Sequence, residues 1–190
     1  MNLSEYQQKA RETAIYLGIP YTTMIYPALG LMGECGEVTE KVKKLIRDDN
    51  WHITKKRSDA IKKGLSDCCW YLANICCDTD LDLEMMYQMR GSSIVHRLRS
   101  FTIYQLVIFL NVNASSVANK LSEWYYSYEC RLNEYQRFIE IPTNISNIIT
   151  CIETIANRLD TQLHEILDIN LAKLRIRKEN KTLHGSGDNR

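Results

Sequence analysis

Three carboxylates stand in two short segments of the chain, where they could together hold a divalent cation. Glu34 and Glu37 are three residues apart, and Asp67 follows in a later apolar stretch. On a helix, residues three apart lie on one face, and Glu40 would extend this acidic row by one step. A row of like charges is unfavourable unless a cation neutralises it. Mg²⁺ is suited to this because it prefers oxygen ligands and keeps water and phosphate in its shell; Mn²⁺ is the second candidate metal.

The spacing of the glutamates leaves an alternative open, a solvated acidic stripe balanced by neighbouring lysines. Those lysines are Lys41, Lys43 and Lys44. Asp67 favours the metal site, because a lone carboxylate in an otherwise apolar helix is costly to bury without a partner. If its helix faces that of Glu34 and Glu37 across a bundle, the three acids complete one site from two helices.

Several side chains near these acids could contact a nucleotide. Tyr71 and Asn74 follow Asp67 by four and seven residues on the same helix face. There they could offer a flat ring and an amide to a base or a sugar. Lys44 is a candidate phosphate contact. Trp51 could touch a base, or it could equally anchor a loop.

Helical periodicity dominates the elements that must position these residues. In one stretch the apolar residues recur mainly at three- and four-residue steps, at Ala28, Leu29, Met32, Val38, Val42 and Leu45. Strand signals are weak, and 101–110 is the one run where a helix and a buried strand compete. We therefore expect an all-α bundle of about eight helices, at about 4–17, 25–47, 56–78, 82–94, 101–111, 114–136, 144–159 and 162–179.

A weak internal repeat at an offset of about 80 residues supports a duplicated bundle. The apolar pattern of 28–42 resembles that of 107–121, and 83–89 resembles 163–169, although two amphipathic helices of similar length could give this by chance. In this alignment the positions of Glu34, Glu37 and Asp67 are taken by Asn113, Ser116 and Asn147. The second copy would then keep the packing face, lack the charges and serve a structural role.

Composition limits the class of protein. The 190 residues suit one large domain or two small, closely packed ones, and 45% hydrophobic with 25% charged residues is typical of a folded globular protein. A net charge of +1 argues against a general nucleic-acid binder. No apolar run approaches the roughly 20 residues of a membrane span, and the start lacks a signal-peptide layout. We expect a cytoplasmic protein whose seven cysteines mainly pack in the core.

Three segments resemble the motifs of MazG-like nucleoside triphosphate pyrophosphohydrolases, in the order found in that family. The first is Tyr26–Lys41, the second is Leu65–Ala73, and the third is Asn170–Lys178 followed by Gly185–Asp188. The resemblance implies an all-α domain that hydrolyses a nucleoside triphosphate to a monophosphate and pyrophosphate. It also implies Mg²⁺ held by a Glu-x-x-Glu pair and a later Glu-x-x-Asp pair.

Carried over residue by residue, the resemblance assigns metal binding and catalysis to Glu34, Glu37 and Asp67, with Glu40 as an extra candidate ligand. It assigns contacts with phosphate or nucleotide to Asn170, Lys173 and Arg177. Without the resemblance, the basic residues of that last group could simply be the solvated end of a helix.

The resemblance also implies how the chain is divided. Single-copy members assemble as dimers or dimers of dimers, so a fused second copy would supply packing that a partner subunit normally provides. We expect a MazG-like nucleotide-binding repeat over 1–95 and a degenerate structural repeat over 96–165. The remaining segment, 166–190, would contact phosphate and pack with the first repeat. A homodimer remains the expected assembly.

One position departs from the family pattern, because Gly64 stands where the second pair should begin with an acid. Losing that carboxylate would weaken binding of a second metal ion. Three functions therefore stay open. The first is a Mg²⁺-dependent hydrolase of (d)NTPs, and the second is a protein that sequesters a nucleotide or nucleotide-derived signal without cleaving it. The third is a purely structural helical module.

Overall fold

The computed structural model describes residues 1–19, 22–126 and 136–183, and every regular element in these ranges is helical. The prediction of an all-α fold is confirmed. Two short elements are irregular, a 3₁₀ helix η1 and a π-helical turn η2. In chain order the elements are α1 (Leu3–Arg11), η1 (Ile15–Gly18), α2 (Ile25–Asp48), α3 (Lys55–Asp78), α4 (Leu83–Gln88), α5 (Ser92–Ser100), α6 (Ile103–Tyr126), η2 (Gln136–Glu140), α7 (Ile141–Arg158) and α8 (Leu163–Glu179).

The hairpin of α2 and α3 forms the centre of the fold and carries the three acids. The buried seam of α2 alternates steps of three and four residues, and consists of Ala28, Leu31, Cys35, Val38, Val42 and Leu45. It packs against α3 and α6. Two residues predicted for this seam, Leu29 and Met32, are instead 65% and 41% exposed. The seam passes through Leu31 and Cys35 instead, so Leu29 and Met32 lie on the outer face of α2.

Helix α3 is buried on most sides because it contacts α1, α2, α7 and α8. Its N-cap is Thr54, whose hydroxyl oxygen accepts a hydrogen bond from the amide of Arg57 at 3.2 Å. The described cysteines are free thiols, and three of those in α3 (Cys68, Cys69 and Cys76) lie in the core. Burial raises the pKa of Cys69 and of Cys76, so both remain neutral packing groups.

A second hairpin, formed by α6 and α7, repeats the first. Its long helix α6 has 24 residues, like α2, and its buried seam has the same spacing, at Val107, Leu110, Ala114, Val117 and Leu121. Helices α3 and α7 are each followed by a turn in which an aspartate has left-handed backbone conformation, Asp80 (φ 56°) and Asp160 (φ 51°). A further helix then begins at Leu83 and at Leu163. The 80-residue offset seen in the sequence is therefore also an offset of structure.

Several predicted boundaries were wrong. The first helix ends at Arg11 rather than at 17, and the helix predicted at 82–94 is interrupted near Gly91, the N-cap of α5. The helices predicted at 101–111 and 114–136 are one helix, α6, as far as Tyr126, and 127–135 lie outside the described residues. The polar residues at the supposed break continue the helix because their side chains are satisfied. Asn111 donates to the hydroxyl of Thr39 on α2 at 2.6 Å, and Asn113 donates to the carbonyl of Phe109 at 2.7 Å.

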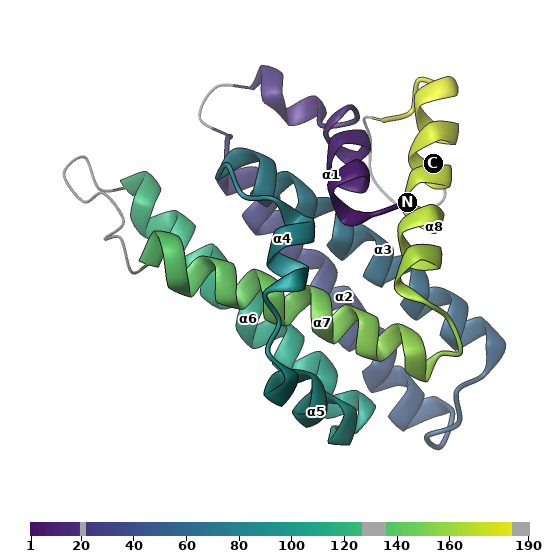
Figure 1. Cartoon of the computed structure of the whole chain (residues 1–190). Coiled ribbons are helices and arrows are strands. Elements are labelled where there is room, and N and C mark those ends of the chain that lie inside the picture. The colour runs from purple at the N-terminus through teal and green to yellow at the C-terminus, as the bar shows by residue number, and fades with distance from the viewer. Residues whose placement is uncertain (20–21, 127–135, 184–190) are drawn as a thin grey trace.

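The helices surround the α2–α3 hairpin on two sides. Figure 1 shows the α6–α7 hairpin on one side and α8 on the other, with α1 beside α8. Helix α8 packs along α3, and α2 packs along α6. The C-terminal helix thus returns to the first hairpin after the second hairpin has been completed. Among the described helices, none combines the length and apolar character needed to cross a membrane.

Candidate functional site

Helix α2 turns Glu34 and Glu37 toward α3 and α8 because the neighbouring positions Cys35 and Val38 are buried. Glu34 is half-buried and Glu37 is exposed. Both side chains line one hollow of about 190 Å³, together with Asp67. The structure therefore brings together the three acids that the sequence singled out.

Asp67 projects from α3 toward α8, where two predicted ligand contacts meet it. The ammonium group of Lys173 forms an ion pair with Oδ1 of Asp67, and both side chains are only 15% exposed. Nδ2 of Asn170 donates to the same oxygen at 3.3 Å. The hydroxyl of Tyr6 in turn donates to Oδ1 of Asn170 at 2.9 Å, which fixes the amide. Helix α1 thus orients a residue of α8 toward an acid of α3.

The hollow combines acids with a cation and with aromatic rings. Arg177 of α8 is 8% exposed and lines it, as does Asn170. Three rings complete its wall, those of Tyr26, Trp70 and Tyr71. Its volume is below the roughly 300–1,000 Å³ of pockets that enclose a small ligand. We therefore expect part of a bound nucleotide to extend beyond it.

Glu34 carries the clearest electrostatic signature of the site. Its pKa is raised to about 7, first because burial removes water from the carboxylate, and then because the negative charges of Asp67 and Glu37 are close. Lys173 and Lys41 act in the opposite direction without cancelling these effects. A divalent cation bound beside Glu34 would favour the charged form of this carboxylate and lower its pKa.

The donor set fits a hard cation that shares its shell with other oxygens. In the described part of the chain, no group of three His, Cys, Asp or Glu side chains is placed to hold one ion. A cation here would therefore bind fewer than three of these carboxylates at once, and water or phosphate oxygens would complete its shell. Mg²⁺ characteristically binds through one or two carboxylates together with substrate phosphates.

Gly64 departs from the family pattern, and the structure shows what takes the place of the missing acid. A Cβ at this position would lie 2.8 Å from Cγ2 of Val38 and 3.1 Å from Nζ of Lys41. The lysine ammonium also lies 3.3 Å from Oε2 of Glu37. A cation from α2 therefore occupies the space into which an acid from α3 would extend.

The aromatic wall depends on a close approach between α2 and α3. The ring of Tyr71 covers Gly30, where an added Cβ would lie 2.1 Å from Cε1 of the ring. Trp70 and Tyr71 meet edge to face with centroids 4.9 Å apart, and Tyr26 lies 6.3 Å from Tyr71. Glycine at position 30 thus gives Tyr71 its place against the hollow.

Four predicted residues are not brought to the hollow. Glu40 forms ion pairs with Lys43 and Lys44 on the outer surface of α2, and Nζ of Lys44 lies 3.4 Å from Oε1 of Glu40. Glu40 and Lys44 therefore point away from the hollow. Asn74 is buried, and its Oδ1 accepts a hydrogen bond from Arg11 at 3.2 Å. Trp51 does not line the hollow; its ring packs against Tyr104 of α6 with centroids 5.9 Å apart, as a loop anchor would. The predicted motif segment Gly185–Asp188 lies outside the described residues.

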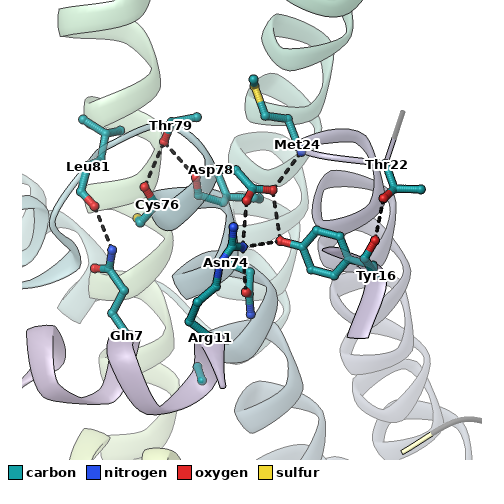
Figure 2. Close-up of polar contacts among 12 residues, drawn as sticks. Gln7, Arg11, Tyr16, Thr22, Met24, Asn74, Cys76, Asp78, Thr79 and Leu81 are labelled. Atoms are coloured by element: carbon teal, nitrogen blue, oxygen red, sulfur yellow. Dashed lines mark hydrogen bonds and ion pairs between the residues drawn. The ribbon is translucent and has the colours of Figure 1, made fainter. Parts of the chain in front are cut away.

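Sequence reasoning missed the network that includes Asn74. Figure 2 shows Asp78, at the end of α3, between Arg11, Tyr16 and Met24. Its carboxylate pairs with Arg11 at 2.7 Å and accepts hydrogen bonds from the hydroxyl of Tyr16 at 3.0 Å and from the amide of Met24 at 2.8 Å. Met24 has a positive φ of 64°, which is uncommon for a non-glycine residue. The network fixes the chain that leads into α2.

This network positions one wall of the hollow. The ring of Tyr26 stacks on that of Tyr16 with centroids 4.8 Å apart, and Tyr16 is held by Asp78. Thr13, on the same segment, accepts a hydrogen bond from Nε1 of Trp70 at 2.9 Å and also lines the hollow. An acidic residue at the end of a helix was the only sequence signal of this arrangement.

Comparison with known proteins shows similarity to a phage protein. The Gene 37 protein of Mycobacterium phage L5 is 37% identical over 101 residues, which are 51% of this chain and 89% of that protein. Nearly the whole relative is therefore matched, while about half of this chain lies outside the match. No family model matches the chain, and no solved structure matches it.

Proposed function

The chain belongs to the family of the Gene 37 protein of Mycobacterium phage L5, and we propose that it is a Mg²⁺-dependent nucleoside triphosphate pyrophosphohydrolase. The reaction adds water across the α–β phosphoanhydride of a (d)NTP and releases a (d)NMP and pyrophosphate. The observation that supports this best is the meeting of three kinds of group in one hollow. These are acids from α2 and α3, Arg177 from α8, and the rings of Tyr26, Trp70 and Tyr71.

Each kind of group has a role in the proposed reaction. One or two of the acids Glu34, Glu37 and Asp67 would hold Mg²⁺ at a time, and the bound ion would supply neutralising charge and an activated water. Lys173 and Arg177 would stabilise negative charge on the phosphates. The aromatic rings offer flat apolar surfaces for a base. The resemblance of these segments to the motifs of MazG-like enzymes points to the same reaction.

A second candidate is a protein that binds a nucleotide without cleaving it. The specific observation in its favour is the position of Lys41, whose ammonium lies 3.1 Å from where a Cβ of residue 64 would be. A lysine there neutralises Glu37 and opposes a second metal ion. With one ion the hollow could retain a nucleotide, yet lack the paired ions that clamp the attacking and leaving oxygens.

The test is incubation of the protein with each NTP and dNTP, with and without Mg²⁺, followed by chromatography of the products. Stoichiometric release of monophosphate and pyrophosphate over many turnovers supports the hydrolase. Recovery of intact nucleotide after the protein is denatured supports the binder. A flat calorimetric titration with every nucleotide argues against both and leaves the structural module.

One substitution separates the two candidates further. Gly64→Glu is a poor choice, since any Cβ there crowds Val38. Lys41→Glu instead places a carboxylate near the same space without a new contact at position 64. A large gain in Mg²⁺-dependent rate would identify a lapsed catalytic site, whereas an unchanged or lower rate would show that Lys41 is compatible with catalysis. Lys43→Glu, on the exposed side of α2, is the matched control.

A further inference from the structure

A second hollow lies between α3 and α8, next to the proposed site. Its volume is about 410 Å³, and basic side chains outnumber acidic ones in its lining. Four cations line it, Lys62, Lys63, Lys173 and Arg177, against a single acid, Asp59. We call it the basic groove. The chain as a whole has a net charge of only +1, so this concentration of positive charge is local.

The form of the groove strengthens its attraction for anions. Ile169 and Ile176 of α8 provide an apolar side between the cations, and most of its lining surface is apolar. Low-dielectric walls focus the field of the charges they separate. An anion bound here would therefore be attracted more strongly than by the same lysines on an open helix face.

The basic groove and the acidic hollow are connected through α8. Arg177 lines both. Lys173 lines the groove while its ammonium pairs with Asp67, an acid of the hollow. A phosphate chain held through Mg²⁺ at the acids of the hollow could therefore continue past Lys173 and Arg177 into the groove. Since the hollow alone is small for a nucleotide, the groove supplies the additional space.

We propose that the basic groove binds the β- and γ-phosphates of the nucleotide, and that Lys62 and Lys63 make the site selective for triphosphates over monophosphates. This rests on the proposed function for the nucleotide, but the groove itself would recognise any pyrophosphate group, including free pyrophosphate. Both lysines are on α3, one turn before the metal-binding position Asp67. Their chemistry is that of compact point charges, which suits a mobile phosphate chain.

The test is a double substitution, Lys62→Ala with Lys63→Ala, in the full chain. Its matched control is Lys55→Ala with Lys56→Ala, which removes the same two charges from exposed positions of the same helix. Calorimetry would measure binding of inorganic pyrophosphate, of the four dNTPs and of the four dNMPs, each with Mg²⁺. We expect the groove variant to bind pyrophosphate and dNTPs about tenfold more weakly, a loss of about 1.4 kcal/mol, with dNMP affinity unchanged.

The control variant should change each affinity less than about twofold, because screened exposed charges contribute little at physiological salt. Asp59→Asn removes the opposing acid of the groove and should strengthen pyrophosphate binding by a few-fold. Should the alanine variant unfold, the double variant Lys62→Gln with Lys63→Gln would be used in its place, because glutamine keeps most of each side-chain stem. Unchanged dNTP and pyrophosphate affinities, or equal losses for dNTPs and dNMPs, would overturn the proposal.

The outcome for the groove is distinct from that for the proposed function. Wild-type protein that binds pyrophosphate through Lys62 and Lys63 but cleaves no nucleotide would support the groove and refute the hydrolase. If the wild-type protein cleaves dNTPs and the double substitution leaves the KM for dNTPs unchanged, the result would support the hydrolase and refute the groove. Absence of pyrophosphate binding to the wild type would refute the groove directly.

Discussion

The two helical hairpins hold different chemistry at equivalent positions. Across α2 and α3, Glu34 and Asp67 are two neighbouring carboxylates, and α8 supplies Lys173 as the ionic partner of Asp67. Across α6 and α7, the corresponding residues are Asn113 and Asn147. Nδ2 of Asn147 donates to Oδ1 of Asn113 at 2.9 Å. One scaffold thus carries either a charged pair that needs a partner or an amide pair that satisfies itself.

This difference shows where stability and function separate in the molecule. The amide pair completes its hydrogen bonds within its own hairpin, because Asn113 also donates to the carbonyl of Phe109. Burial, and then the neighbouring negative charges of Asp67 and Glu37, raise the pKa of Glu34 to about 7, which means that its charged form is unfavourable in the folded chain. Such local conflicts with stability are typical of functional sites. The second hairpin shows the same architecture without that conflict.

The largest effect should follow from making the first hairpin resemble the second. Asp67→Asn keeps the shape of the side chain but removes a charge, so that the proposed Mg²⁺ site would lose a ligand and Lys173 would lose its ionic partner. We expect nucleotide turnover, or Mg²⁺-dependent nucleotide affinity, to fall by at least about 100-fold. Steady-state kinetics and calorimetry would measure it, with Asp48→Asn on the exposed end of α2 as the control. A loss of less than about threefold would contradict the role of Asp67.

The reverse change tests the second hairpin. Asn147→Asp places a carboxylate against the Oδ1 of Asn113, where it can no longer donate the hydrogen bond. We expect the free energy of unfolding to fall by about 2 kcal/mol at pH 8. The loss should be smaller at pH 5, because a carboxyl whose pKa is raised by this environment would be protonated and could donate again. Urea unfolding at both pH values measures this. Equal stability at pH 8 with new Mg²⁺ binding would show that α6 and α7 already provide a metal site.

Protonation of Glu34 gives the next effect. With its pKa at about 7, the carboxylate is mostly protonated at pH 6 and mostly charged at pH 8, so Mg²⁺ affinity should rise about tenfold over this range. Glu34→Gln should remove the rise. The folded chain holds this proton more tightly than the unfolded chain, so the site lowers stability as pH increases from about 4.5 to 7. Glu34→Gln should therefore stabilise the metal-free protein at pH 8, by about 1 kcal/mol after allowance for solvent screening.

Both parts of this prediction have clear measurements. Calorimetric titration of Mg²⁺ at pH 6, 7 and 8 tests the first, and thermal unfolding of both proteins at pH 5 and 8 tests the second. At pH 5 the two proteins should be equally stable, since Glu34 is then already neutral. A variant that is less stable at pH 8 would mean that the charge of Glu34 supports the fold.

The smallest effect concerns the outer face of α2. Gly33 has no atom within 4 Å of an added Cβ, and its counterpart in α6 is Val112. Gly33→Ala should therefore stabilise the protein by about 0.5–1 kcal/mol through helix propensity and leave nucleotide binding unchanged. Gly30→Ala is the informative contrast, since it displaces the ring of Tyr71 and should weaken nucleotide binding. A Gly33→Ala variant with reduced binding would show that this outer face belongs to the site.

The sequence predicted the elements best where periodicity was strong. The helices expected at 25–47 and 56–78 end within one residue of α2 and α3. The break expected near residue 112 does not exist, because packing against α2 satisfies Asn111. Polar residues inside a helix look like a turn until their tertiary partners are known. The end of α1 at Arg11 was missed as well, and the ion pair of Arg11 with Asp78 joins two segments far apart in the sequence.

The candidate site was predictable only as far as helix geometry extends. Spacing of three residues correctly placed Glu34 and Glu37 on one face. Asn74 was predicted at the site because it shares a face with Asp67, but seven residues are about 10 Å along a helix, which takes it past the hollow to Arg11. Lys44 likewise follows Glu37 by seven residues, which places it beyond the hollow. The ring of Tyr26 and the segment before α2 could not be foreseen, because their positions depend on Asp78, far along the chain.

The anchoring of that segment has a consequence for the thermodynamics of association. Tyr26 rests on a ring whose hydroxyl is held by Asp78, and the same carboxylate holds the amide that precedes α2. This part of the binding surface is thus ordered before any ligand arrives. A nucleotide stacking there would lose little additional chain entropy on binding. Affinity for the base can accordingly be gained or lost at the far end of α3, through residues that never touch the ligand.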